Sequence, residues 1–118
     1  MKVHYRKFPV KSRDWSEILD FYKDFRPGMF EFVAWLRDSE YAFALFGGIS
    51  LDSLIIGQSK TFEYRRDVIR LRDVGGKFAL TYHENETAES TKEFEKHELI
   101  PAFEKLLASL HWFRKEEF

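Results

Sequence analysis

The chain has 118 residues, 44% of them hydrophobic and 33% charged, a composition typical of one globular domain and unlike that of a disordered chain. It contains no cysteine, which excludes disulfide scaffolds, Cys-ligated metal centres and thiol nucleophiles. Lys and Arg number 19 against 20 Asp and Glu, for a net charge of −1, so the overall charge favours neither nucleic acid nor an anionic membrane as a partner.

The first predicted elements are a strand and a helix. Val3 and Tyr5 alternate with polar residues, which predicts a half-buried strand that ends near Pro9. Ser12 is a favourable residue for the start of a helix, and the apolar residues after it recur at helical spacing. These residues are Trp15, Ile18, Leu19, Tyr22 and Phe25. The sequence Arg-Pro-Gly at residues 26–28 should end this helix.

The middle of the chain has the composition of strands. Residues 30–37 are rich in aromatic and β-branched side chains, and residues 41–46 are apolar, so we expect a hairpin whose turn is the polar triplet 38–40. Residues 51–57 are apolar and fit either a strand or a short helix. Residues 61–65 contain alternating aromatic side chains, which predicts a further strand.

A second hairpin is predicted in the last half of the chain. Residues 68–72 and 77–84 have the pattern of strands, and they flank an Asp-Val-Gly-Gly turn at residues 73–76. A polar loop should follow at residues 85–90, because this segment has no large apolar side chain. The two turn glycines favour the tight turn that a hairpin requires.

The C-terminal segment from about Thr91 should be helical. Its apolar residues form one broad stripe at helical spacing. They are Leu99, Ile100, Phe103, Leu106, Leu107, Leu110 and Phe113. Phe94 and Trp112 fall outside this stripe. Pro101 removes a backbone hydrogen bond and clashes with the preceding turn, so we expect a kink there or a second helix that starts near Leu99.

These elements follow the order β-α-β-β-β-β-β-α. We therefore predict a single α+β domain over residues 1–118, with one mainly antiparallel, curved sheet of about 5–6 strands and two amphipathic helices packed on it. No stretch approaches the roughly 20 apolar residues of a membrane helix, and the N-terminal residues lack the apolar core of a secretory signal. We expect a cytoplasmic protein with no membrane partner.

Histidines are the natural candidates for catalysis or metal binding, and the chain has 4. His97 lacks the second histidine of a zinc-protease motif, because Pro101 stands in that position. The remaining candidate is His83 with Glu84 and Glu86, which should lie together at a strand end as a base and its partner. The simpler interpretation is that the histidines are ordinary surface residues. We expect no metal and no cofactor.

Basic residues gather around the predicted hairpin. If the apolar side chains of residues 68–72 face inward, the arginines there face outward, and a lysine joins them across the turn. This basic strip comprises Arg66, Arg70, Arg72 and Lys77. Residues 84–104, in contrast, hold seven Glu against two Lys. The strip is then a solvated sheet face, the partner of the acidic segment, or a docking surface for an acidic protein. The acidic segment disfavours nucleic acid.

Aromatic residues make up 18% of the chain. The strands predicted at 30–37 and 41–46 carry them on both faces, so one face that includes Trp35 would be exposed if helices covered only the other. Exposed Trp and Tyr are typical of interface hot spots. The alternative is a sheet that is covered on both faces or curls onto itself.

These features favour a small cytosolic, non-enzymatic module that binds another protein, or a second copy of itself as a homodimer, through an aromatic sheet face and the basic hairpin. An inhibitor or immunity-type role belongs to this class by analogy of size alone. The second hypothesis is a hydrolase or nuclease that uses His83 with Glu84 or Glu86. The third is nucleic-acid binding through the basic hairpin, which we consider unfavourable because the chain is not basic overall.

Overall fold

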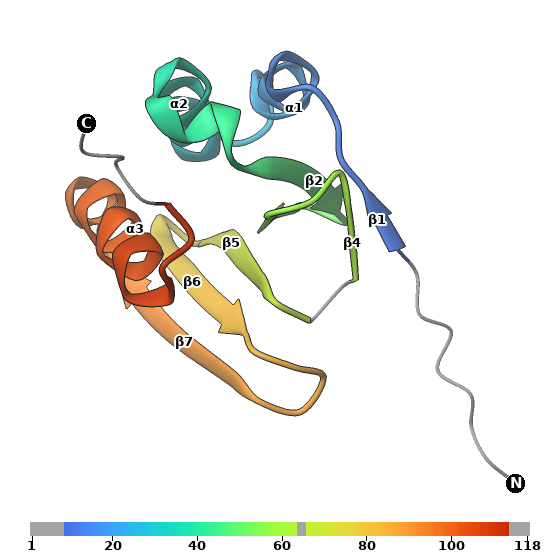
Figure 1. The fold of residues 1–118 in the computed structure, drawn as a ribbon. Helices are drawn as coiled ribbons and strands as arrows, with labels where there is room; N and C mark the ends of the chain where they lie inside the picture. Colours follow the sequence, from blue (N-terminus) through green and yellow to red (C-terminus); the bar gives the residue numbers. More distant parts are fainter. Residues whose placement is uncertain (1–8, 64–65, 114–118) are drawn as a thin grey trace, which may run out of the picture.

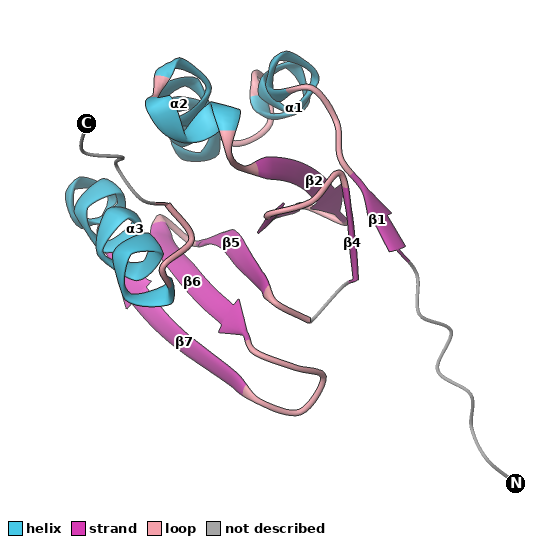
Figure 2. Cartoon of the chain, in the orientation of Figure 1, coloured by secondary structure: helices cyan, strands magenta, loops and turns pink. Residues whose placement is uncertain are grey.

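The computed structural model describes residues 9–63 and 66–113 (Figure 1). The strand predicted around Val3 and Tyr5 lies outside these residues, and so does the end of the strand predicted at 61–65. Within the described residues the predicted fold class is confirmed, because helices pack on an antiparallel sheet in a mixed α+β arrangement (Figure 2). None of the described helices is both long enough and apolar enough to cross a membrane.

Most strands belong to one antiparallel sheet of five strands, in the order β2-β3-β5-β6-β7. Its members are β2 (Phe46–Ser50), β3 (Ser53–Gly57), β5 (Val68–Val74), β6 (Lys77–His83) and β7 (Glu89–Phe94). A two-stranded ribbon joins β1 (Pro9–Lys11) to β4 (Thr61–Glu63). The predicted hairpin around residues 73–76 is confirmed. Val74 pairs with Lys77, and both turn glycines have a positive φ, as a tight two-residue turn requires.

The helices of the described residues cover one face of this sheet. They are α1 (Trp15–Tyr22), α2 (Pro27–Asp38) and α3 (Lys96–Leu110), with a 3-10 helix η1 (Glu40–Phe43). Figure 1 shows α3 alongside β6 and β7, and α1 and α2 near β2. Phe32 of α2 and Phe103 of α3 share one buried cluster with Leu71 of β5 and Leu80 of β6. The inward side chains of the strands are thus those that the alternation predicts.

The hairpin predicted at residues 30–37 and 41–46 is wrong. Residues 27–38 form α2, and residues 40–43 form η1. Pro27 occupies the first position of α2, where its fixed φ favours a helix and its missing N–H costs nothing. The buried residues of α2 then recur at helical spacing, and they are Met29, Phe32, Val33 and Leu36. The spacing of the buried residues therefore prevails over an aromatic composition that favoured a strand.

The start of the C-terminal helix was also predicted too early. Residues 89–94 form β7, and α3 begins only at Lys96. Glu95 and Glu98 form a reciprocal capping box, in which each side chain accepts a hydrogen bond from the other's backbone N–H. One continuous helix then runs through Pro101. The apolar stripe is confirmed, with Leu99, Phe103 and Leu107 buried.

The opposite face of the sheet carries a second, smaller cluster. Phe62 of β4 packs there against Ile55 of β3 and Val68 of β5. Gly57 leaves the space for the Phe62 ring, because a Cβ at this position would lie 2.8 Å from a ring carbon. The β1–β4 ribbon thus covers part of this face, and the rest of β5, β6 and β7 is not covered by the helices.

The turn between β2 and β3 contains a strained leucine. Leu51 has a φ of +57° and is 94% exposed, while the flanking Ser50 and Ser53 pair directly. A left-handed conformation costs a residue with a Cβ about 1–2 kcal/mol. We expect Leu51→Gly to raise the free energy of unfolding by about 1 kcal/mol in urea denaturation. Leu51→Ala keeps the Cβ and should give no such gain, so equal stability of the two variants would contradict the prediction.

Candidate functional site

The residues of the predicted hydrolase site lie at the end of β6 but not at a cavity. His83 is 1% exposed, and its Nδ1 lies 3.2 Å from Oε2 of Glu89 on β7. Glu84 and Glu86 are exposed in the following loop. His83 faces away from the helices, because it alternates with Tyr82, which packs against the main core. His83, Glu84 and Glu86 border neither the cavity between α3 and β7 nor the one between α2 and α3. A catalytic role for them stays a prediction.

The predicted basic strip shares its surroundings with acidic side chains. Arg66 lies 3.9 Å from Glu63, and Lys77 lies 3.8 Å from Glu95. Arg70 is half-buried and Arg72 is exposed, both on the face opposite the helices.

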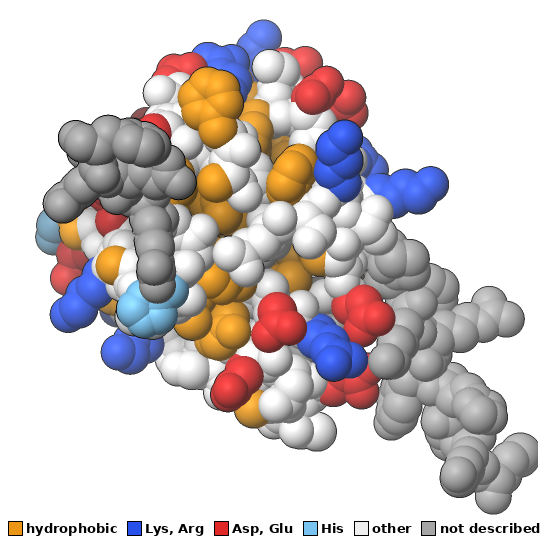
Figure 3. Space-filling view, viewed as in Figure 1, with side chains coloured by type: hydrophobic (Ala, Val, Ile, Leu, Met, Phe, Trp, Pro, Cys, Tyr) orange, Lys and Arg blue, Asp and Glu red, His pale blue; other side chains and the backbone are white. Residues whose placement is uncertain are grey.

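Acidic residues lie on the same face. Across the sheet, Arg72 pairs with Ala79, which in turn pairs with Glu93. On the face that Figure 3 shows, Lys and Arg side chains are interspersed with Asp and Glu. Docking through this strip stays a prediction.

Trp35 does not lie on the sheet. It belongs to α2 and is half-buried, with its ring 5.7 Å from that of Phe32, 5.9 Å from Tyr41 and 6.1 Å from Phe103. The prediction of an exposed aromatic face on strands 30–37 and 41–46 is therefore wrong, because residues 30–37 belong to α2 and residues 41–43 to η1. The rings of Phe32, Trp35 and Tyr41 pack the helices onto the core, whereas Phe43 is exposed.

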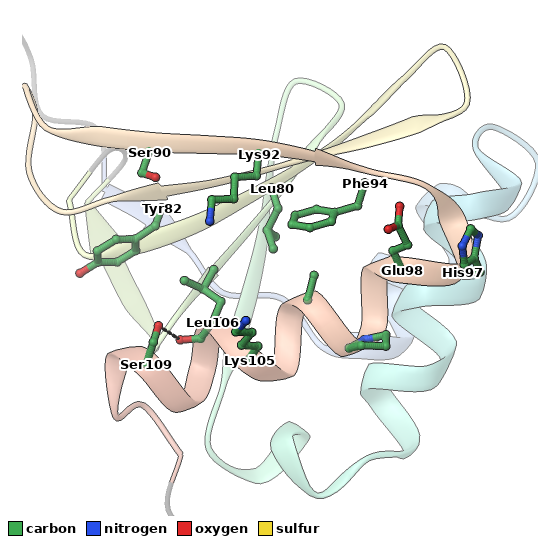
Figure 4. Close-up of a pocket in the computed structure, with 12 residues that line it drawn as sticks. Leu80, Tyr82, Ser90, Lys92, Phe94, His97, Glu98, Lys105, Leu106 and Ser109 are labelled. Carbon is green, nitrogen blue, oxygen red and sulfur yellow. Dashed lines mark hydrogen bonds between the residues drawn. The ribbon is translucent and has the colours of Figure 1, made fainter.

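A groove lies between α3 and the strands β6 and β7. It has a volume of about 800 Å³, within the range of roughly 300–1,000 Å³ that ligand sites occupy. Figure 4 shows β7 and β6 on one side and α3 on the other. Apolar side chains dominate its walls, among them Leu80, Tyr82, Phe94 and Leu106. This groove was not predicted from the sequence.

The local sequence explains how the groove forms. Alternation along β7 directs Ser90, Lys92 and Phe94 toward α3. A single residue, Glu95, separates β7 from α3, so the chain reverses sharply and the helix runs back below the strand (Figure 4). The side chains on the face of α3 that is turned to β7 are smaller or more polar than those on its core face. These residues are Glu98, Pro101, Ala102, Lys105 and Ser109.

The groove lies beside a free strand edge. Within the described residues β7 pairs with β6 alone, so its other side carries backbone groups that no strand satisfies. Hydrogen-bonded and non-bonded pairs alternate along an antiparallel ladder. Glu84 and Ala88 form the next cross-strand pair after His83 and Glu89, and this pair is hydrogen-bonded, since the Glu84 N–H donates to the Ala88 carbonyl. The alternation then turns the backbone groups of Thr91 and Glu93 outward, to the free edge.

Two lysines give the groove a local positive charge. Lys92 and Lys105 make no ion pair within the described residues, whereas Glu98 accepts the Glu95 N–H at 3.0 Å.

Burial, with the charges of Asp67 and Glu84, raises the pKa of Tyr82 above its ordinary value. The Tyr82 hydroxyl therefore stays protonated at neutral pH.

The lining of the groove sets the chemistry that it can offer a ligand. Among the described residues, no group of three His, Asp or Glu side chains is placed to hold a metal ion. The groove offers an apolar wall, two ammonium groups that make no ion pair with any described residue, and an edge of β7 that faces no other described strand. Comparisons with models of protein families, with curated proteins and with solved structures found no match to this chain.

Proposed function

We propose that this protein is a non-enzymatic binding module that takes up an extended segment of a partner protein. The segment adds to the free edge of β7 as a sixth strand, and its alternate side chains enter the groove between β7 and α3. The single observation that carries the proposal is the groove of about 800 Å³ directly beside an edge of β7 that pairs with no other described strand.

Strand addition uses both features of this site. Main-chain hydrogen bonds to the outward groups of Thr91 and Glu93 supply affinity, and side-chain pockets supply selectivity. Groove-facing residues of β7 are two positions apart, which corresponds to roughly 6.6 Å along a strand. An added segment has the same period, so every second side chain would meet α3. The apolar wall around Leu80 and Leu106 gives those side chains a surface to bury.

The composition of β7 fits an edge strand that can pair with a partner but does not pair with every extended chain. Its residues are mostly exposed, and Glu89, Lys92 and Glu93 carry charges. Charged side chains on an edge strand limit indiscriminate pairing with other chains. Pairing then requires a segment whose side chains match those of β7 and of the groove, which is what a selective binding module needs.

A proline at the outward position of β7 tests strand addition. In Glu93→Pro the variant loses the N–H that would bond the partner, while the neighbouring pairs to β6 remain. A displayed library of random eight-residue peptides provides the probe, and the selected peptides are measured by fluorescence anisotropy. We expect affinity to fall about tenfold in Glu93→Pro, and to stay unchanged in Glu93→Ala.

Amide hydrogen exchange provides the matching structural measurement. The amides of Thr91 and Glu93 should become protected when a selected peptide binds, because they then donate to its carbonyl groups. Circular dichroism of Glu93→Pro verifies that the variant is folded. The proposal fails if the library yields no binding peptide, or if Glu93→Pro binds the selected peptides as well as the unaltered protein does.

A further inference from the structure

The groove beside β7 contains two lysines that form no ion pair with the described residues around them. Lys77 and Lys96 lie near the same helix start, and each is paired with a glutamate, Glu95 and Glu31 respectively. Lys92 and Lys105 line the groove and have no such partner within the described residues. Figure 4 shows Lys92 reaching from β7 toward α3, where Lys105 lies.

One carboxylate lines the groove with these two lysines and offsets part of their charge, which leaves the lining with an excess of one positive charge. Glu98 is the carboxylate that lines the groove, and its Oε1 already accepts the Glu95 N–H at the start of α3. Two ammonium groups beside an apolar wall repel each other and attract an anion, and their interaction with it strengthens as the groove closes over a ligand. A carboxylate between the two lysines would interact with both.

Apolar surface flanks the lysines on both sides. Toward one end the wall is formed by Tyr82 and Leu106, and toward the other by Phe94 (Figure 4). Lys92 lies between them, because Ser90 and Phe94 are its neighbours on the same face of β7. An added strand therefore meets apolar, basic and apolar surface in turn, at intervals of two residues.

We infer that the segment bound by β7 is acidic at its centre, with Asp or Glu at the position that faces Lys92 and Lys105. Apolar residues lie two positions before and two positions after the acid, over the two apolar parts of the groove. This inference rests on the proposed function, since the alternation of side chains follows from strand addition. It names the partner's chemistry, which is an extended acidic peptide and not a basic one.

Three matched peptides test the charge preference. They are acetylated and amidated Thr-Val-Thr-X-Thr-Val-Thr sequences, labelled with a fluorophore, in which X is Glu, Gln or Lys. We expect the Glu peptide to bind about fivefold tighter than the Gln peptide, a size typical of partly exposed ion pairs. The Lys peptide should bind most weakly. Raising the ionic strength should reduce the difference between Glu and Gln.

Variants of the lysines assign the preference to the groove. Lys92→Gln with Lys105→Gln should bind the Glu and Gln peptides equally, and Lys92→Glu with Lys105→Glu should prefer the Lys peptide. Lys60→Gln, an exposed lysine between β3 and β4, serves as the matched control and should keep the preference.

The outcomes separate this inference from the proposed function. If the Glu and Gln peptides bind equally to the unaltered protein, the acidic partner is refuted while strand addition stands. If a preference for Glu survives in the double Gln variant, the acid is recognised elsewhere and the inference is wrong. If none of the three peptides binds and the random library also yields none, both proposals fall.

Discussion

Replacing Phe103 by Ala is expected to lower the free energy of unfolding by about 3–5 kcal/mol, a range typical of truncating a fully buried aromatic side chain. Phe103 is 0% exposed and lies at the centre of α3. Its ring meets the rings of Phe32, Trp35 and Tyr41 edge-on, at centroid distances of 5.2, 6.1 and 6.4 Å. The side chain thus joins α3 to α2 and η1.

The size of this effect follows from both burial and geometry. Truncation removes the apolar contacts of the ring and leaves a cavity. The surrounding helices can move to fill only part of this cavity. Edge-on aromatic pairs contribute about 0.5–1.5 kcal/mol beyond the area that they bury. Since Phe103 makes three such pairs, we place the loss near the upper half of the range.

Urea denaturation followed by circular dichroism measures the change. Phe43→Ala is the matched control, because Phe43 is 93% exposed and its truncation should alter stability by no more than about 0.5 kcal/mol. A loss in Phe103→Ala that is no larger than the loss in Phe43→Ala would contradict the observed packing of α3 on α2.

Local signals in the sequence were sufficient for some elements. The hairpin of β5 and β6 was predictable because Gly75 and Gly76 supply the two positive φ angles of its turn. The flanking strands then follow from alternation, with Ile69 and Leu71 buried on one face. In α3, apolar residues at helical spacing identify the face that is buried. These patterns depend only on neighbours in the chain, so one sequence reveals them.

At α2 the composition of the segment and the spacing of its apolar residues favour different structures. Aromatic and β-branched side chains are common in strands because they pack well on a pleated surface, but tertiary packing readily overrides this preference. The buried set that includes Met29 and Leu36 has helical spacing, and Pro27 marks the helix start. Those two signals were present in the sequence, and together they predict the observed helix.

The groove could not be predicted, because its formation depends on a strand without an apolar pattern. The residues of β7 are nearly all exposed, and only Phe94 at its end is half-buried. A strand is held in such a sequence by pairing with a neighbour, as shown by Thr91, whose hydroxyl lies 2.8 Å from that of Thr81 on β6. Such pairing is not local, and the segment was therefore predicted as the beginning of the following helix.

A second large effect is expected where α1 packs on β2. Gly47 of β2 lies directly under α1, and a Cβ at this position would be 2.6 Å from one ring carbon of Trp15 and 2.8 Å from Cδ1 of Ile18. Its backbone is fixed as well, since the Gly47 carbonyl accepts the Arg13 N–H at 2.9 Å. We expect Gly47→Val to lower the free energy of unfolding by about 1–3 kcal/mol, because the helix must shift away from the strand.

A double-mutant cycle with Trp15→Ala tests this cause. If the Trp15 ring is the obstacle, its removal makes space for the new side chain, and the double variant should be more stable than the sum of the two single losses predicts. Contacting residues give interaction energies of about 0.5–3 kcal/mol in such cycles. Additive losses would show that the valine acts through some other contact. The missing side chain of Gly47 would then not be what allows α1 to pack so close to β2.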